Sequence, residues 1–236
     1  FLSMLVSQLA VALSSRGLLG FLVLADPENA NTFGSQLRRV GVDGVMVASF
    51  HPYSTLERSI RSLQVPAMFV GRPGAEFGDY PYIDVDNFRG GFDAGKRIVS
   101  IGRVRVAQIA GPKGMNVAQD REAGFVSALR NSFCKQLDVD YGPFTLEHGA
   151  QGMARILSKF PDIDGVFAHS DQIAAGAMHV LAESGRRVPE DVAVIGFDDS
   201  SMARATNPPL TTLRQPVGGI AHISPLCTSD AAADLP

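Results

Sequence analysis

Short apolar runs alternate along the chain with longer stretches in which apolar residues recur at helical spacing. The short runs are rich in Val and Ile, which is typical of strands that are covered on both faces, as in a parallel sheet. Strands that alternate with helices predict crossover connections, and therefore an α/β fold with doubly wound parallel sheets. The predicted strands are 19–25, 44–48, 66–70, 104–110, 165–169 and 191–197, and the predicted helices are 32–40, 55–63, 89–101, 118–133, 150–160 and 172–184.

Glycines indicate where several helices end. The last apolar position of a helical stretch is followed by glycine at four places, which are Gly17, Gly41, Gly102 and Gly185. Glycine has no Cβ, so it adopts the left-handed conformation that closes many helices at the lowest cost. These four positions therefore predict helix boundaries.

The two ends of the chain differ from the usual pattern of such a fold. Residues 1–17 open directly as a helix, whereas an open parallel sheet of this type usually begins with a strand. We expect that first strand to be absent, which would leave unpaired backbone groups on its neighbours. The segment after Val217 has neither helical nor strand periodicity, so we expect an atypical return segment over 216–236.

The opening helix is apolar on nearly all sides. Leu2, Val6, Leu9 and Leu13 form one stripe, and further apolar residues lie on the other faces. Such a helix is buried on more than one side. Two interpretations remain open: the helix lies inside the domain core, or one face packs on the sheet and the other on a second subunit.

Composition narrows the class of protein. Apolar residues make up 45% and charged residues 19%, which is typical of a folded globular chain. The net charge of −3 argues against a broad basic face that grips nucleic acid. Two cysteines are too few for a disulfide scaffold or a thiolate metal site. No apolar run reaches the roughly 18 residues that a membrane-spanning helix needs.

The sequence contains no local signature of catalysis. None of the five histidines has the short spacing of a zinc site, and no serine lies in a nucleophile elbow. Gly111–Gly114 follows a predicted strand, but it lacks the Lys-Ser/Thr pair of a phosphate loop. We therefore expect a protein that is not an enzyme and has no catalytic residue, metal or cofactor.

Polar residues gather at the carboxyl ends of the predicted strands, where open α/β sheets bind their ligands. Carboxylates, guanidinium groups and small hydroxyls of this kind bind neighbouring hydroxyl groups, so a sugar is a fitting ligand. Each residue alone could also be a helix cap or part of a surface ion pair, and Asp171 reads more readily as an N-cap. The candidates are Ser49, Arg72, Asp86 with Asn87, Arg121, Ser170, Asp171, Asp198 and Asp199.

The segment VPEDVAVIGFDDSSMARATNPPLTTLRQPV, residues 188–217, strongly resembles the lactose/galactose-repressor (LacI/GalR) family of bacterial transcription regulators. Further matches follow in the family's order: GVDGVMVAS, VPAMFVGRP, YIDVDNFRGGFDAG, IAGP, DREAGFVSAL and FAHSDQIAAGAMHVL. The resemblance covers about residues 1–217. It implies the two-lobed fold of periplasmic sugar-binding proteins, with residues 1–87 as the first lobe, 88–215 as the second, and the ligand between them.

The family's effector site can be transferred position by position. Gly71 stands where many members have Asp, Glu147 stands near an aromatic position, and Ser170 replaces a frequent Asn. No metal site is implied. The resemblance implies effector-binding roles for Phe1, Ser49, Arg72, Asp86, Arg121, Glu147, Ser170, Asp198 and Gln215.

The resemblance implies an effector-binding and dimerisation core of a cytoplasmic regulator, with a sugar or sugar derivative as its ligand. The family's helix-turn-helix is absent from this chain, so we expect operator DNA to be bound only through that missing N-terminal domain, and we expect no membrane contact. The alternative is a periplasmic sugar-binding protein of a transport system, which would share the fold and a similar cleft.

Overall fold

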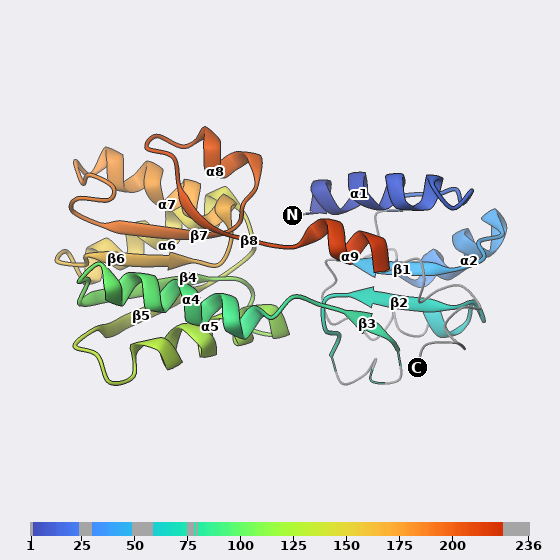
Figure 1. Cartoon of the computed structure of the whole chain (residues 1–236), viewed down its shortest axis with the longest axis horizontal. Helices are drawn as coiled ribbons and strands as arrows, with labels where there is room; N and C mark the ends of the chain where they lie inside the picture. The colour runs from blue at the N-terminus through green and yellow to red at the C-terminus, as the bar shows by residue number, and fades with distance from the viewer. Residues whose placement is uncertain (1, 24–29, 49–58, 75–77, 79, 224–236) are drawn as a thin grey trace. The chain divides into compact units, whose positions relative to one another are not determined.

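The computed structural model describes residues 2–23, 30–48, 59–74, 78 and 80–223. The chain divides into two compact units, one formed by Phe1–Val85 with Pro216–Pro236 and the other by Asp86–Gln215. Each unit contains a parallel sheet with helices packed beside it (Figure 1). Asp86 and Asn87, which the sequence analysis counted with the first lobe, belong to the second unit.

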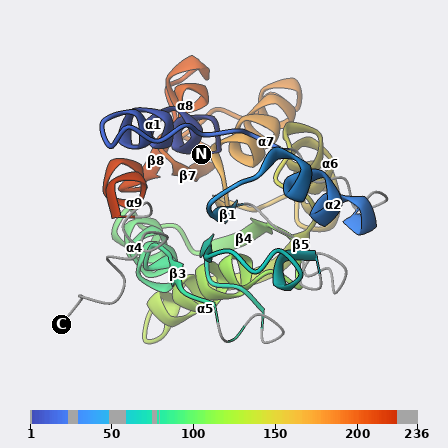
Figure 2. The same ribbon diagram turned by 90° about the vertical axis from the view of Figure 1, so that its right-hand side faces the viewer.

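The first unit has a three-stranded parallel sheet in the order β1-β2-β3. Helices α1 and α9 lie side by side in this unit (Figure 2), and Leu5, Val70, Val217 and Ile220 form their shared apolar cluster. The elements are α1 (Leu2–Ser14), α2 (Ala30–Val40), β1 (Val45–Ala48), β2 (Ala67–Val70), β3 (Tyr82–Ile83) and α9 (Val217–Ile223).

The strand predicted at 19–25 is wrong in its described part. Residues 19–23 form no strand, and the Leu19 side chain is 88% exposed. A strand needs a hydrogen-bonded neighbour, and no described segment pairs with this one. An apolar run rich in Leu and Val therefore does not become a strand by composition alone.

Two predictions for the first unit need correction, one for the opening helix and one for the return segment. In α1 only Leu5 and Ala12 are buried, while Val11 is 68% exposed, so a helix enclosed by the core is wrong. The subunit-contact interpretation stays a prediction. The return segment is helical over α9, because Val217, Ile220 and Ala221 bury one face in spite of two glycines with poor helix propensity. The rest of that prediction, residues 224–236, lies outside the described residues.

The second unit has a five-stranded parallel sheet in the order β5-β4-β6-β7-β8. Helices α4 and α5 cover one face and share an apolar cluster with it, while α6 and α7 cover the other (Figure 1). The strands are β4 (Arg105–Ala110), β5 (Lys135–Tyr141), β6 (Gly165–Ala168), β7 (Ala193–Asp198) and β8 (Thr211–Arg214), and the helices are α4 (Asn87–Ser100), α5 (Asn116–Leu129), α6 (Leu146–Lys159), α7 (Asp171–Glu183) and α8 (Ser201–Ala205).

Most predicted elements are confirmed to within a few residues. The four predicted helix-ending glycines all have left-handed backbone angles, with φ between 69° and 76°. Strands β5 and β8 were not predicted, because their polar residues hide the apolar pattern. The helix predicted at 118–133 ends at Leu129. Of the helix predicted at 55–63, residues 59–61 are helical, and residues 55–58 lie outside the described residues.

No helix in the described ranges has the length and hydropathy to cross a lipid bilayer.

Glycines let the covering helices of the second unit meet backbone to backbone. A Cβ at Gly91 of α4 would clash with the carbonyl oxygen of Arg121, and one at Gly124 of α5 would clash with that of Phe88. Helices α6 and α7 meet in the same way: a Cβ at Gly149 of α6 would clash with the carbonyl oxygen of Ile173, and one at Gly176 of α7 would clash with that of Leu146. The α4–α5 contact is important for function because it fixes where Arg121 lies.

Replacing Gly91 should therefore destabilise the second unit. We expect Gly91→Ala to lower the free energy of unfolding by about 1–3 kcal/mol, the usual cost of overpacking, despite alanine's better helix propensity. Urea denaturation measures this change. The control is Gly114→Ala, which meets open space in the same unit. Equal stability of the two variants would contradict the backbone contact.

Candidate functional site

The guanidinium group of Arg121 is the centre of the candidate site. Arg121 lies in the second turn of α5 and is only 4% exposed. Its Nε donates to Oδ1 of Asn87 at 3.0 Å, and its Nη1 donates to the carbonyl oxygen of His169. Its Cζ lies 3.6 Å from the centre of the Phe197 ring, a cation–π contact. Contacts from α4, from the residue after β6 and from β7 thus fix the orientation of this charge.

Asp198 ends β7 beside this group. It is 8% exposed, and its Oδ1 accepts a hydrogen bond from Nε2 of Gln215 at 2.5 Å. Burial raises the pKa of Asp198, while the charge of Arg121 and the Gln215 hydrogen bond act in the opposite direction. The second unit therefore brings a buried cation, a buried carboxylate and an amide together at one sheet edge.

The backbone at Asp198 is strained. Asp198 has φ of 121° and Asp199 has φ of 51°, both in the region that favours glycine. Such conformations cost on the order of 1–3 kcal/mol each for a residue with a side chain, and they persist where surrounding contacts hold them. Strain of this kind is concentrated at binding sites, which supports a functional role for this edge.

The residue whose carbonyl binds Arg121, His169, has a side chain that is hydrogen-bonded to a row of polar side chains. The ring is fully buried, its Nε2 lies 2.9 Å from Oε1 of Gln108, and Nε2 of Gln108 donates to Oε1 of Gln136 at 2.6 Å. These hydrogen bonds place the imidazole proton on Nε2 of His169. Burial and the nearby Arg121 charge hold the pKa of His169 well below its usual value. The ring is therefore a neutral support for the site.

Four of the predicted site residues gather at this edge: Arg121, Ser170, Asp198 and Gln215. Ser170 follows the His169 carbonyl that binds Arg121, and its hydroxyl accepts from the Ile173 amide at 3.2 Å. Ser170 is thus the N-cap of α7, and the prediction that Asp171 is that cap is wrong. Asp171 occupies the first helical position instead.

The remaining predicted site residues stay predictions, and two of them are not described. Asp86 is the N-cap of α4 and accepts from the Arg89 amide at 2.7 Å. Glu147 is exposed in the first turn of α6 and accepts from Gln151. Arg72 is exposed after β2 in the first unit, where its amide donates to Asp84. Phe1 and Ser49 lie outside the described residues.

Sequence reasoning missed the site contributions of Phe197 and His169. Phe197 was assigned to an apolar strand and His169 to the end of another, so both read as core. The signal that could have found Phe197 is its place directly before Asp198. Alternation along a strand sends its ring to the α5 face, where Arg121 lies.

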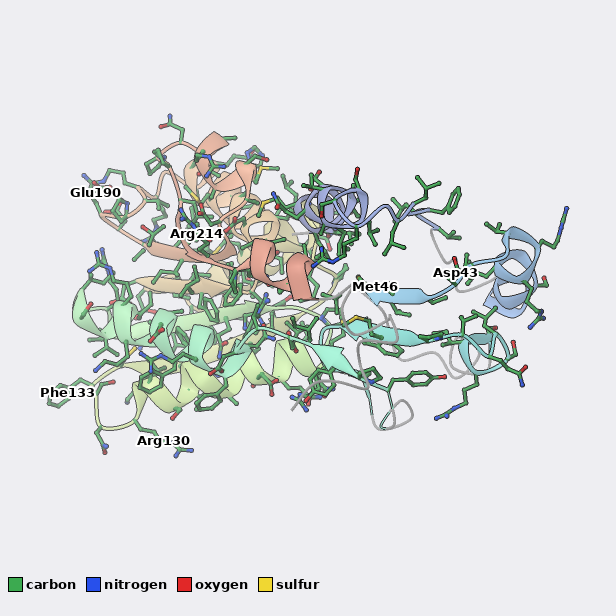
Figure 3. The ribbon with its side chains drawn as sticks, turned by 45° about the vertical axis from the view of Figure 1, so that its right-hand side comes forward. Asp43, Met46, Arg130, Phe133, Glu190 and Arg214 are labelled. Carbon is green, nitrogen blue, oxygen red and sulfur yellow. The ribbon has the colours of Figure 1, made fainter. Side chains whose placement is uncertain are left out.

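The chemistry available at this edge is hydrogen bonding to hydroxyl groups. A guanidinium donates in a planar fork, a carboxylate accepts, and charge-assisted bonds of this type are strong. The described residues contain no group of three His, Cys, Asp or Glu side chains that could hold a metal ion. Glu190 and Phe133, which precede β7 and β5, lie at the opposite end of the sheet (Figure 3).

A family model described as "Periplasmic binding protein-like domain" matches residues 96–224, more than half of the chain. The chain belongs to this periplasmic-binding-protein-like family. Its resemblance to LacI/GalR regulators is also confirmed, because the similar curated proteins are regulators of that type. The two-lobed α/β fold class that the sequence predicted is confirmed by the same matches.

Two relatives illustrate the match. The HTH-type transcriptional regulator CelR of Thermobifida fusca is 39% identical over 222 residues, which is 92% of this chain and 65% of CelR. The HTH-type transcriptional repressor CytR of Escherichia coli K12 is 32% identical over 84% of this chain and 60% of CytR. This periplasmic-binding-protein-like chain therefore spans less than two thirds of the length of these relatives.

Solved structures agree. A complex of the regulator CelR with cellobiose has a TM-score of 0.88 at 35% identity, covering 99% of this chain and 73% of that one. A LacI transcriptional regulator from a Rhodococcus species has a TM-score of 0.82 at 27% identity, covering 94% and 82%. The lac repressor dimer bound to operator and the anti-inducer ONPF has a TM-score of 0.81 at 23% identity, covering 94% and 78%, and shares the fold.

Neutral burial of His169 predicts a pH dependence of stability. The folded pKa lies below the unfolded value near 6.5, so the unfolded chain takes up a proton that the folded chain does not. Above the unfolded pKa, the neutral His169 does not reduce the free energy of unfolding. Below it, the free energy of unfolding falls with the pH, by up to about 1.4 kcal/mol per pH unit.

Urea unfolding between pH 7 and pH 5 tests this dependence. His169→Gln should show a shallower fall in the free energy of unfolding than the wild type. The matched comparison is His179→Gln, which removes a largely exposed histidine of α7. A His169→Gln slope as steep as that of the wild type would contradict the assignment.

Proposed function

We propose that this chain is the effector-binding core of a LacI/GalR-type transcription regulator and that its ligand is a sugar. The observation that carries the proposal is a pair of buried charges at the carboxyl edge of one sheet: the Arg121 guanidinium contacts the Phe197 ring, and the Asp198 carboxylate belongs to the next residue of β7. Such groups are costly to bury, and a ligand with adjacent hydroxyls would use both. The chain acts by binding rather than by catalysis.

Cellobiose is the first ligand to test. The CelR structure named as a cellobiose complex is 35% identical to this chain over 99% of its length. In the proposed site, Arg121 donates to hydroxyl oxygens of the sugar, Asp198 accepts from its hydroxyl groups, and Gln215 orients Asp198. Arg72, Asp86, Glu147, Ser170, Phe1 and Ser49 remain proposed contributors.

Regulation follows from differential affinity. In the proposed mechanism the sugar binds residues of both units and favours their closed arrangement. A nearly complete switch needs roughly 5 kcal/mol of difference between the two states. Two or three charge-assisted hydrogen bonds of about 1.5–3 kcal/mol each supply that difference.

The proposed regulator is a cytoplasmic homodimer. The relatives extend beyond the region that this chain matches, and the proposal assigns operator binding to that remainder and effector binding to this chain. The named relatives are regulators, which favours this function over a periplasmic transport protein of the same fold.

Isothermal titration calorimetry with cellobiose and a panel of mono- and disaccharides tests the proposal. We expect Asp198→Asn and Arg121→Lys to weaken binding of the best sugar at least tenfold, because each loses a charge-assisted bond or the planar fork. Asp162→Asn is the control, since Asp162 is an exposed partner of Arg105. Circular dichroism checks that each variant folds.

Two results would overturn the proposal. One is the absence of measurable binding of every sugar by the wild-type chain. The other is wild-type affinity in folded Asp198→Asn and Arg121→Lys variants.

A further inference from the structure

We propose that Asp171 is a positioning residue that holds Asp198 in its binding conformation and does not itself contact the ligand. The inference deepens the proposed function and rests on it. Three observations carry it: the hydrogen bonds that the Asp171 carboxylate accepts, the glycine over which that carboxylate passes, and the backbone strain in the segment that it holds.

The carboxylate of Asp171 is fully buried and is bound by the loop that follows Asp198. One oxygen accepts from the backbone amide of Ser200 at 2.7 Å and from its hydroxyl at 2.8 Å. The other oxygen accepts from the hydroxyl of Thr212 on β8 at 2.5 Å. Three of the roughly four acceptor sites of this carboxylate are therefore used within the second unit, and we assign it a structural role.

Gly196 provides the path for this side chain. Asp171 begins the helix after β6, whereas Thr212 lies on β8, and β7 runs between these two strands. A Cβ at Gly196 of β7 would lie 2.6 Å from Oδ1 of Asp171, so only glycine leaves room for the carboxylate to cross. We call the hydrogen bonds that Asp171 accepts from Ser200 and Thr212 the clamp. The glycine that the clamp requires lies two residues before Asp198 in the sequence.

The clamp holds the strained segment between its two ends. Asp198 and Asp199 have positive φ angles, and Ser200, the next residue, is bound to Asp171. The Thr212 hydroxyl that donates to Asp171 also lies 3.3 Å from the amide of Asp199, which donates to it. Without the carboxylate both anchors weaken, and the segment can relax toward ordinary backbone angles that turn the Asp198 side chain away.

The first test is the sugar affinity of Asp171→Asn, which keeps the shape of the side chain and removes its charge. We expect affinity for the best-binding sugar of the panel to fall about tenfold or more. This is the size of loss expected when Asp198, turned away from the sugar, no longer forms its charge-assisted hydrogen bond. The control is Asp191→Asn. Asp191 accepts three hydrogen bonds from Arg187 at the other end of β7, and its loss should leave affinity unchanged.

The second test asks whether Asp171 acts through Asp198. In an Asp198→Asn background the further change Asp171→Asn should have little effect, because the group that it positions is already gone. Equal fold-losses in both backgrounds would show that Asp171 supports the unit in general and would overturn the positioning role. Wild-type affinity in folded Asp171→Asn would overturn it as well.

Hydrogen exchange separates this proposal from the proposed function. In Asp171→Asn without sugar, the Ser200 amide should exchange at least tenfold faster, while amides within β7 keep their wild-type rates. Unchanged protection of Ser200 would overturn the clamp whether or not a sugar binds. Failure of the wild-type chain to bind any sugar would instead overturn the proposed function and leave the exchange result to decide the clamp alone.

Discussion

A guanidinium group that leaves water must recover its lost hydration in fixed contacts, and Arg121 recovers it from three elements at once. Asn87 of α4 and the His169 carbonyl after β6 accept hydrogen bonds from it, and Phe197 of β7 covers its face. These contacts require the backbones of α4 and α5 to touch, which is possible because Gly91 and Gly124 have no side chain. The position of the central charge is therefore set by the packing of two helices.

The carboxylate half of the site depends on a different device. Asp198 occupies a strained backbone conformation and is bound by Gln215, while the loop after it is anchored to Asp171. The two halves meet at Phe197, whose ring covers the Arg121 guanidinium and which directly precedes Asp198 in β7. Helix packing places the cation and a hydrogen-bonded loop places the anion, so each can be disturbed separately.

The sequence predicts the alternating architecture and much of this edge. Buried strands such as β4 and β7 have apolar runs long enough to identify, and Asp198 and Gln215 follow from family motifs. The edge strand β5 was missed because polar residues alternate with its apolar residues and interrupt any continuous apolar run. The run at 19–23 was wrongly predicted as a strand because a strand also needs a neighbouring strand to pair with. Local patterns do not carry such tertiary information.

The role of Asp171 illustrates the same limit. An acidic residue before QIAAGAM fits an N-cap locally, yet Ser170 takes that position and frees Asp171 to reach across β7. Nothing near Asp171 in the sequence identifies Thr212, which is 41 residues away, as its partner. Gly196 is the one clue, and its meaning is visible only once the strand order is known.

A crystal structure of the chain grown with its highest-affinity sugar would show whether Arg121 and Asp198 bind the ligand together. We expect sugar hydroxyl oxygens within about 3.2 Å of both the Arg121 guanidinium and the Asp198 carboxylate. We also expect Asp198 to keep its positive φ angle. A sugar bound away from the carboxyl edge of β6, β7 and β8, or one that contacts neither group, would contradict the proposed site.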